Sequence, residues 1–147
     1  RFSKVHQQAA QGEKAAWRQT LQGRLAEIIV LDQFSRNLFR DQPQSFAYDG
    51  MALVLTQEAI ATGNLETLTP TERSFLYMPL MHSESLFIHE EALKRFAEKG
   101  MENNLDFEKQ HQAIIKRFGR YPHRNKILGR TSTAEEIAFL KKPNSSF

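Results

Sequence analysis

The chain of 147 residues has the length of one domain and can bury a core without disulfide or metal support. It contains no cysteine, which excludes disulfides, thiolate zinc sites and cysteine nucleophiles; because this suits a reducing compartment, it predicts a cytoplasmic protein. The net charge is only +3, and no apolar run approaches the roughly 18 residues of a membrane span, so no membrane partner is expected.

Start and stop signals predict helices along the whole chain, and no segment shows the alternating pattern of a strand. Capping boxes at Thr69/Glu72 and Thr133/Glu136 mark two helix starts, and glycines after helical patterns mark several ends. The expected fold class is therefore all-α. The predicted helices cover residues 2–11, 14–39 (with a possible break near Gly23), 47–62, 70–82, 84–99, 104–118, 123–129 and 134–142.

The helix predicted at 14–39 is apolar on almost every side in its second half, which indicates a central helix covered by its neighbours. The polar residues in this half therefore need a reason: they are Asp32, Gln33, Arg36 and Asn37. Asp32 and Arg36 have the i, i+4 spacing of an ion pair. Either they form an internal bridge that fixes neighbouring loops, or Asp32 orients Arg36 or a histidine toward a cleft.

Proline interrupts the helix predicted at 70–82. Pro79 has no amide hydrogen and crowds the carbonyl four residues back, so we expect the helix to kink or end there. His82, Ser83 and Glu84 follow directly. They form a ligand-binding or proton-transfer cluster, or Ser83 caps the next helix while Glu84 complements its positive end and His82 packs.

The sequence carries no metal or cofactor signature. His82 and His89 lie seven residues apart with no chelating residue at the required spacing between them. HExxH, GxSxG and glycine-rich phosphate-binding motifs are also absent. We therefore predict neither a metal ion nor a cofactor.

The helix predicted at 104–118 has one apolar stripe, which contains a histidine. The stripe consists of Phe107, His111, Ile114, Ile115 and Phe118. Because these positions share one face of a helix, we expect all five side chains to pack in the core.

A basic segment without any acid lies between Glu108 and Glu135. Its cationic residues are Lys109, Lys116, Arg117, Arg120, Arg124, Lys126 and Arg130. Since the whole chain carries only +3, this charge is local and suggests an anionic partner. Alternatively, the arginines complement a helix C-terminus or bridge to distant acids, for which Asp32 and Glu84 are candidates. Few aromatic residues interleave with the charges, so nucleic acid is not the expected partner.

Three motifs resemble an uncharacterised family catalogued as domain of unknown function 924, whose members are similar to tetratricopeptide-repeat (TPR)-like helical proteins. The motifs are LDQFSRNLFR (31–40), FLYMPLMHSE (75–84) and RFGRYPHRNKILGR with TSTAEEIAFL (117–140). The resemblance implies one domain over residues 1–147, a TPR-like superstructure of antiparallel helix hairpins, and a further helical segment before Arg1. Ser35 departs from the family, which often has proline there, so we expect a softer bend at this point. The family implies no activity.

Two hypotheses for function follow. The first is a binding module that recognises a small anionic molecule or an acidic peptide through clustered Arg, His and Asn side chains. The second is a hydrolase or transferase for a phosphorylated or carboxylated small molecule, with His82 or His123 as acid/base. The candidate ligand-binding residues are Asp32, Gln33, Arg36, Asn37, His82, Glu84, Arg117, Arg120, His123, Arg124, Asn125 and Arg130.

Overall fold

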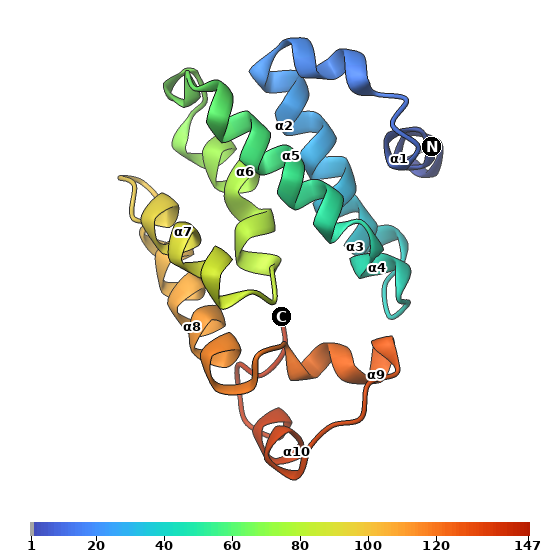
Figure 1. Cartoon of the computed structure of the whole chain (residues 1–147), viewed down its shortest axis with the longest axis vertical. Helices are drawn as coiled ribbons and strands as arrows, with labels where there is room; N and C mark the ends of the chain where they lie inside the picture. Colours follow the sequence, from blue (N-terminus) through green and yellow to red (C-terminus); the bar gives the residue numbers. More distant parts are fainter. Residues whose placement is uncertain (1) are drawn as a thin grey trace.

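The long helices in the middle of the chain run alternately down and up through the protein (Figure 1). The computed structural model describes residues 2–147, and within this range it contains helices and no strand, which confirms the all-α prediction. The α-helices are α1 (Phe2–Ala10), α2 (Leu21–Ile29), α3 (Ser35–Leu38), α4 (Gln44–Ala47), α5 (Asp49–Thr62), α6 (Pro70–His82), α7 (Leu86–Phe96), α8 (Glu102–Phe118), α9 (Asn125–Leu128) and α10 (Ala134–Leu140). Short 3-10 segments lie at η1 (Ala15–Gln19), η3 (Leu65–Thr67) and η4 (Pro122–Arg124), and η2 (Val30–Phe34) is a π-helical turn.

Neighbouring helices pack in sequence order: α5 contacts α6, α6 contacts α7, and α7 contacts α8, while α2 lies against both α5 and α6. This series of antiparallel neighbours is compatible with a TPR-like superstructure. The main core lies between α2, α5, α6 and α7, where Ile28, Ala59, Leu76 and Phe96 are fully buried. A smaller core forms where Tyr121 meets the end of α8. None of the described helices is long and apolar enough to cross a membrane.

The break in the second predicted helix lies a few residues earlier than expected. Thr20 begins α2 by accepting a hydrogen bond from the Gly23 amide, so Gly23 lies inside the first turn. A side chain at position 23 would come within 1.9 Å of the Trp17 carbonyl oxygen, so only glycine fits there. Gly23 therefore allows a close approach of η1 and does not end a helix.

Other boundaries follow the predicted signals with one exception. Both capping boxes are formed, at Thr69/Glu72 and at Thr133/Glu136. Helix α6 covers the predicted range Pro70–His82, so Pro79 lies inside the helix and does not end it. The exception is the cap of α7, which is not Ser83: Ser85 accepts the Ile88 amide, whereas the Ser83 hydroxyl accepts the Ser85 amide in the preceding turn.

The predicted core stripe of α8 is correct only in part. His111, Ile114 and Ile115 are buried, and Phe118 packs against Tyr121 and its neighbours. Phe107 is 56% exposed, so its assignment to the core was wrong. The core-facing side of α8 carries Leu105 and Glu108, with Met101 at its N-cap, and Phe107 lies off this side, where it lines a cavity.

Candidate functional site

The π-helical turn η2 places a carboxylate inside the protein. Asp32 lies in the middle of this turn and is only 1% exposed. The hydroxyl of Ser35 donates to the Leu31 carbonyl oxygen, so it can only accept from His6 Nε2, at 2.8 Å. A proline at position 35 could make neither bond. Turns of this kind recur at functional sites.

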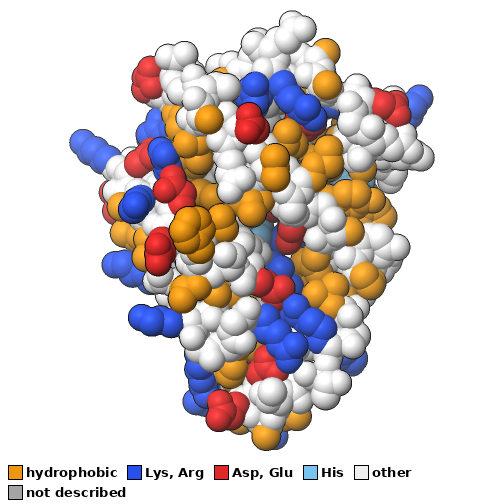
Figure 2. All heavy atoms as spheres, viewed as in Figure 1, with side chains coloured by type: hydrophobic (Ala, Val, Ile, Leu, Met, Phe, Trp, Pro, Cys, Tyr) orange, Lys and Arg blue, Asp and Glu red, His pale blue; other side chains and the backbone are white. Residues whose placement is uncertain are grey.

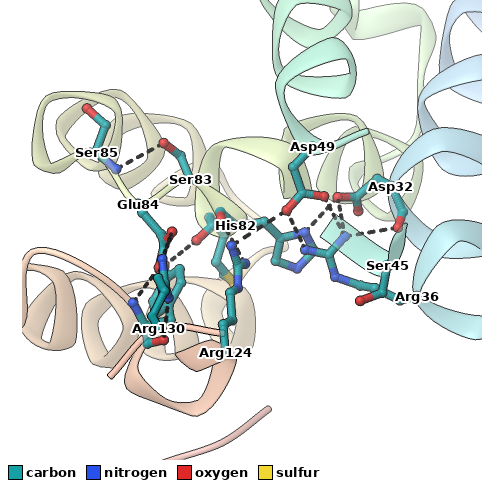
Figure 3. A network of polar contacts seen from close by, with 12 residues as sticks. Asp32, Arg36, Ser45, Asp49, His82, Ser83, Glu84, Ser85, Arg124 and Arg130 are labelled. Carbon is teal, nitrogen blue, oxygen red and sulfur yellow. Dashed lines mark hydrogen bonds and ion pairs between the residues drawn. The ribbon is translucent and has the colours of Figure 1, made fainter. Parts of the chain in front are cut away.

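Asp32 holds the imidazole of His82, which comes from the end of α6, fifty residues along the chain (Figure 3). The distance from Asp32 Oδ1 to His82 Nδ1 is 2.7 Å. Burial acts to raise the pKa of Asp32, but His82, Arg36 and Gln33 outweigh it, so the net pKa is lowered and Asp32 is a carboxylate. A carboxylate only accepts, so His82 Nδ1 carries the hydrogen. His82 Nε2 has no partner among the described residues.

Arg36 forms the predicted ion pair with Asp32, at 3.3 Å, but its main partner is another carboxylate. Its guanidinium donates two hydrogen bonds to Asp49, at 2.9 and 3.0 Å. Asp49 is the first residue of α5 and was not predicted as a site residue. In the sequence, an acid at a helix start is indistinguishable from one that only complements the helix dipole.

Arg124 is a buried cation with incomplete pairing. Its side chain lies between the rings of Phe46 and Tyr121, 4.5 and 4.8 Å from the guanidinium carbon, and is almost fully buried. One terminal nitrogen donates to the His82 carbonyl oxygen at 2.9 Å, and the other is 3.7 Å from Asp49. Nε has no hydrogen-bond partner among the described residues. Burial lowers the pKa of Arg124, yet a guanidinium stays charged in proteins.

The rest of the basic segment is more compensated than the sequence suggested. Arg130 forms two hydrogen bonds with Glu84, which also accepts the Tyr121 amide. Arg120 forms two with Glu136, so Glu136 and not Asp32 or Glu84 is its partner. Figure 2 shows one face of the molecule, and in its lower half basic and acidic side chains lie next to one another.

The remaining predicted site residues have varied positions. Asn125 is buried and bonds Ser132 and Arg130. Gln33 donates to Asp32. Arg117 and Asn37 are exposed, and Arg117 lies over the ring of Phe118. Thus Asp32, Gln33, Arg36, His82 and Arg124 meet at the junction of α3, α6 and η4, whereas Arg117, Arg120, Asn125 and Arg130 lie apart from it.

A cavity of about 350 Å³ borders this junction. No carboxylate is among its lining residues, which are Arg36, Phe46, Met78, Met81, His82, Asn104, Phe107, His111, His123, Arg124 and Phe147. A neighbouring cavity of about 480 Å³ shares Phe46, His82 and Arg124 but is also lined by Asp49 and Glu84. The polar lining of the smaller cavity is therefore cationic or neutral.

Two histidines in the smaller cavity are neutral at pH 7. Burial lowers the pKa of His111 to about 4 and that of His123 to about 4. His111 Nδ1 donates to the Phe107 carbonyl oxygen at 2.7 Å, and His123 Nδ1 is buried without a partner among residues 2–147. No group of three potential metal ligands comes together anywhere in the described part of the chain.

Behind the cavity, a fully buried pair joins α7 to α8. His89 Nδ1 lies 2.6 Å from Glu108 Oε2, and His89 Nε2 lies 2.7 Å from the Ser83 carbonyl oxygen. The carbonyl must receive a hydrogen from Nε2, so one further proton is shared between Nδ1 and Glu108. The Tyr121 hydroxyl donates to the Met81 carbonyl oxygen and accepts from His89. The pair thus fixes the turn after His82 and the start of η4.

The geometry can be compared with known proteins. Residues 1–144 match the profile of a family described as bacterial protein of unknown function, DUF924. The chain is also similar to the solved structure of a protein of unknown function from Agrobacterium tumefaciens, with a TM-score of 0.90 and 35% sequence identity. The similarity covers 95% of this chain and 79% of that one. None of the curated proteins matches the sequence.

Proposed function

The chain belongs to the DUF924 family of bacterial proteins of unknown function, and we propose that it binds a small anionic molecule in the cavity bordered by Arg36, His82 and Arg124. The observation that carries this proposal is the set of residues that line the cavity. Two arginines and three histidines line one cavity, and no carboxylate is among its lining residues.

The state of Arg124 supports the same conclusion. A buried cation is costly unless it is fully paired, and here the nearest carboxylate is 3.7 Å away and already accepts two bonds from Arg36. An anion in the cavity would complete this pairing. The cavity volume of about 350 Å³ is that of a small-molecule site and favours a small molecule over an acidic peptide, which binds along an extended groove.

The proposal predicts that an anion stabilises the native protein but not an Arg124→Gln variant. Inorganic phosphate, sulfate and acetate would be titrated while the thermal midpoint is followed. At about a hundredfold the dissociation constant, a bound anion adds about 2.7 kcal/mol to the free energy of unfolding, so the midpoint rises clearly. Comparing each variant with and without the anion cancels any difference in its basal stability.

Arg117→Ala is the matched control, because Arg117 is exposed and does not line the cavity. It should keep the full response. His123→Gln, which removes an imidazole without a hydrogen-bond partner, gives a second test in case Arg124→Gln does not fold. Equal stabilisation of the native protein and of both cavity variants would contradict the proposal.

A second candidate function is favoured by the Asp32–His82 pair. Asp32 fixes the imidazole through Nδ1 and leaves Nε2 without a protein partner beside the cavity, which is the arrangement of a general base. His82 would take a proton from water as the water attacks an ester or phosphoester, and would return it to the leaving oxygen. His123 is less suited to this role, because it has no carboxylate partner and its pKa is about 4.

If His82 acts as the general base of a hydrolase, His82→Gln should strongly reduce turnover. With a panel of carboxylic esters and phosphomonoesters, kcat should fall by roughly 10²–10⁴-fold, since proton transfer by a positioned side chain contributes that much. The native pH–rate profile should lose its acidic limb in the variant. Arg117→Ala should leave turnover unchanged. Turnover that survives His82→Gln at the native rate would exclude this role of His82.

A further inference from the structure

We infer that the anion bound in this cavity carries an apolar body, so that its class is an organic acid with an alkyl or aryl group rather than a bare inorganic ion. This inference rests on the proposed anion binding and concerns the same cavity. It follows from how the lining residues are ordered along α6 and α8, two of the helices that line the cavity.

Helix α6 presents a polar and an apolar residue one turn apart. His82 follows Met78 by four residues, so they lie on the same face of α6, about 6 Å apart along its axis. His82 contacts Asp32 and, through its carbonyl, Arg124. Met78 therefore lies one turn farther from the charged junction.

Helix α8 repeats this order. Phe107 and His111 are also four residues apart on one face, and both line the cavity. The ring of His111 lies 5.6 Å from that of Tyr121, which in turn contacts the Arg124 guanidinium. The side toward Arg124 is therefore polar on both helices, and the side one turn away is apolar on both.

The ring of Phe107 reaches the surface. Phe107 is 56% exposed although it lines the cavity, and the polar Asn104 lines the cavity about one turn before it. An apolar part of a ligand that covers this ring removes apolar surface from water, which is favourable. Met78 and Met81 add flexible apolar side chains that adapt to different ligand shapes.

The volume fits such a ligand. About 350 Å³ is at the lower end of the range for small-molecule sites, which is roughly 300–1,000 Å³. An inorganic anion next to Arg124 and His82 would leave the side formed by Met78 and Phe107 unfilled. An acid with a short alkyl chain or one aromatic ring would fill both ends.

The inference is tested by the dissociation constants of acetate, hexanoate and hexanamide for the whole chain, measured by NMR titration. Each buried methylene contributes about 0.8 kcal/mol, or about a factor of four in affinity. Hexanoate has four more methylenes than acetate, and if about two of them are buried, it should bind at least tenfold more tightly than acetate. Hexanamide, which lacks the charge, should bind more weakly than hexanoate.

A pair of matched variants assigns the effect to this cavity. Phe107→Ser should weaken the binding of hexanoate severalfold and leave that of acetate unchanged. Phe87→Ser is the control, because Phe87 is 78% exposed on α7 and lines a different cavity. It should change neither constant.

Each contrary outcome has a distinct meaning. Equal affinities for acetate and hexanoate would overturn the apolar body and leave the anion proposal standing. Equal affinities for hexanoate and hexanamide would overturn the anion proposal instead. Binding of none of the three would overturn both, and equal losses in the two phenylalanine variants would overturn the assignment to this cavity.

Discussion

Replacing Glu108 with alanine is expected to lower the free energy of unfolding by about 3 kcal/mol, because it leaves the buried Nδ1 of His89 without its partner and opens a cavity where the side chain was. Both Glu108 and His89 are fully buried, and their side chains lie 2.6 Å apart. Without Glu108, Nδ1 of His89 has neither a donor nor an acceptor nearby. Urea unfolding of the two proteins at pH 7 measures the difference.

Replacing Glu108 with glutamine is expected to lower the free energy of unfolding far less, by no more than the roughly 0.5–1.5 kcal/mol of one ordinary hydrogen bond. Burial acts to raise the pKa of Glu108 and outweighs the opposing contact with His89, so the net pKa is raised and a neutral group suits the site. The amide of glutamine can donate to Nδ1 while His89 still donates to the Ser83 carbonyl oxygen.

Glu90→Ala is the control for this pair of variants, because Glu90 is exposed on the same helix as His89. It should change stability by no more than about 0.5 kcal/mol. If Glu108→Gln proves as damaging as Glu108→Ala, the pair requires a full charge on Glu108 and the shared-proton description is wrong.

Acidification from pH 7 to pH 5 is expected to reduce stability by about 2 kcal/mol for each of His111 and His123. Burial holds the pKa of both near 4, below the ordinary value of 6.5. Between these values the unfolded chain binds more protons than the folded one, so stability falls as the pH falls. The contribution is complete above pH 6.5 and is lost progressively down to about pH 4.

The measurement is the urea midpoint at half-unit intervals of pH between 7 and 5. Asp32 and Glu84 lose their contributions only at lower pH, because their lowered pKa values lie below 3.8 and 4.5, respectively. His123→Phe keeps a ring between Tyr121 and Phe147 and should remove about half of the slope due to the two histidines. A native midpoint that does not change in this window, or a slope that the variant leaves intact, would contradict the assignment.

Local signals in the sequence were sufficient for most helices, but not for the π-helical turn inside the helix predicted at 14–39, and they were insufficient for the contacts between helices. Thr69 and Thr133 lie at their helix starts because a capping box is complete within four residues. By contrast, the pairing of Asp32 with His82 spans fifty residues, so spacing could suggest it only as one alternative among several. Asp49 was missed for the same reason, since its sequence neighbours do not reveal Arg36.

Counting charges over a continuous segment of the sequence wrongly suggested an uncompensated basic surface, for a related reason. The basic residues near the C-terminus have no acid among their neighbours in sequence, but Glu84 and Glu136 reach Arg130 and Arg120 in space. Helical periodicity likewise placed Phe107 in the apolar stripe of α8, but it could not show that neighbouring elements cover the side of the helix with Leu105 and Glu108 and leave Phe107 exposed. In each case the missing information was which elements lie side by side.

The π-helical turn at Val30–Phe34 has a consequence for the phase of the helix that it interrupts. Each residue of an α-helix advances the side-chain direction by about 100°, so one extra residue in a turn rotates everything after it relative to everything before it. Deleting one residue here would give a longer regular helix with better local geometry. It would also rotate Arg36 away from Asp49 and break their two hydrogen bonds. The less regular helix at this point therefore keeps Arg36 directed toward Asp49.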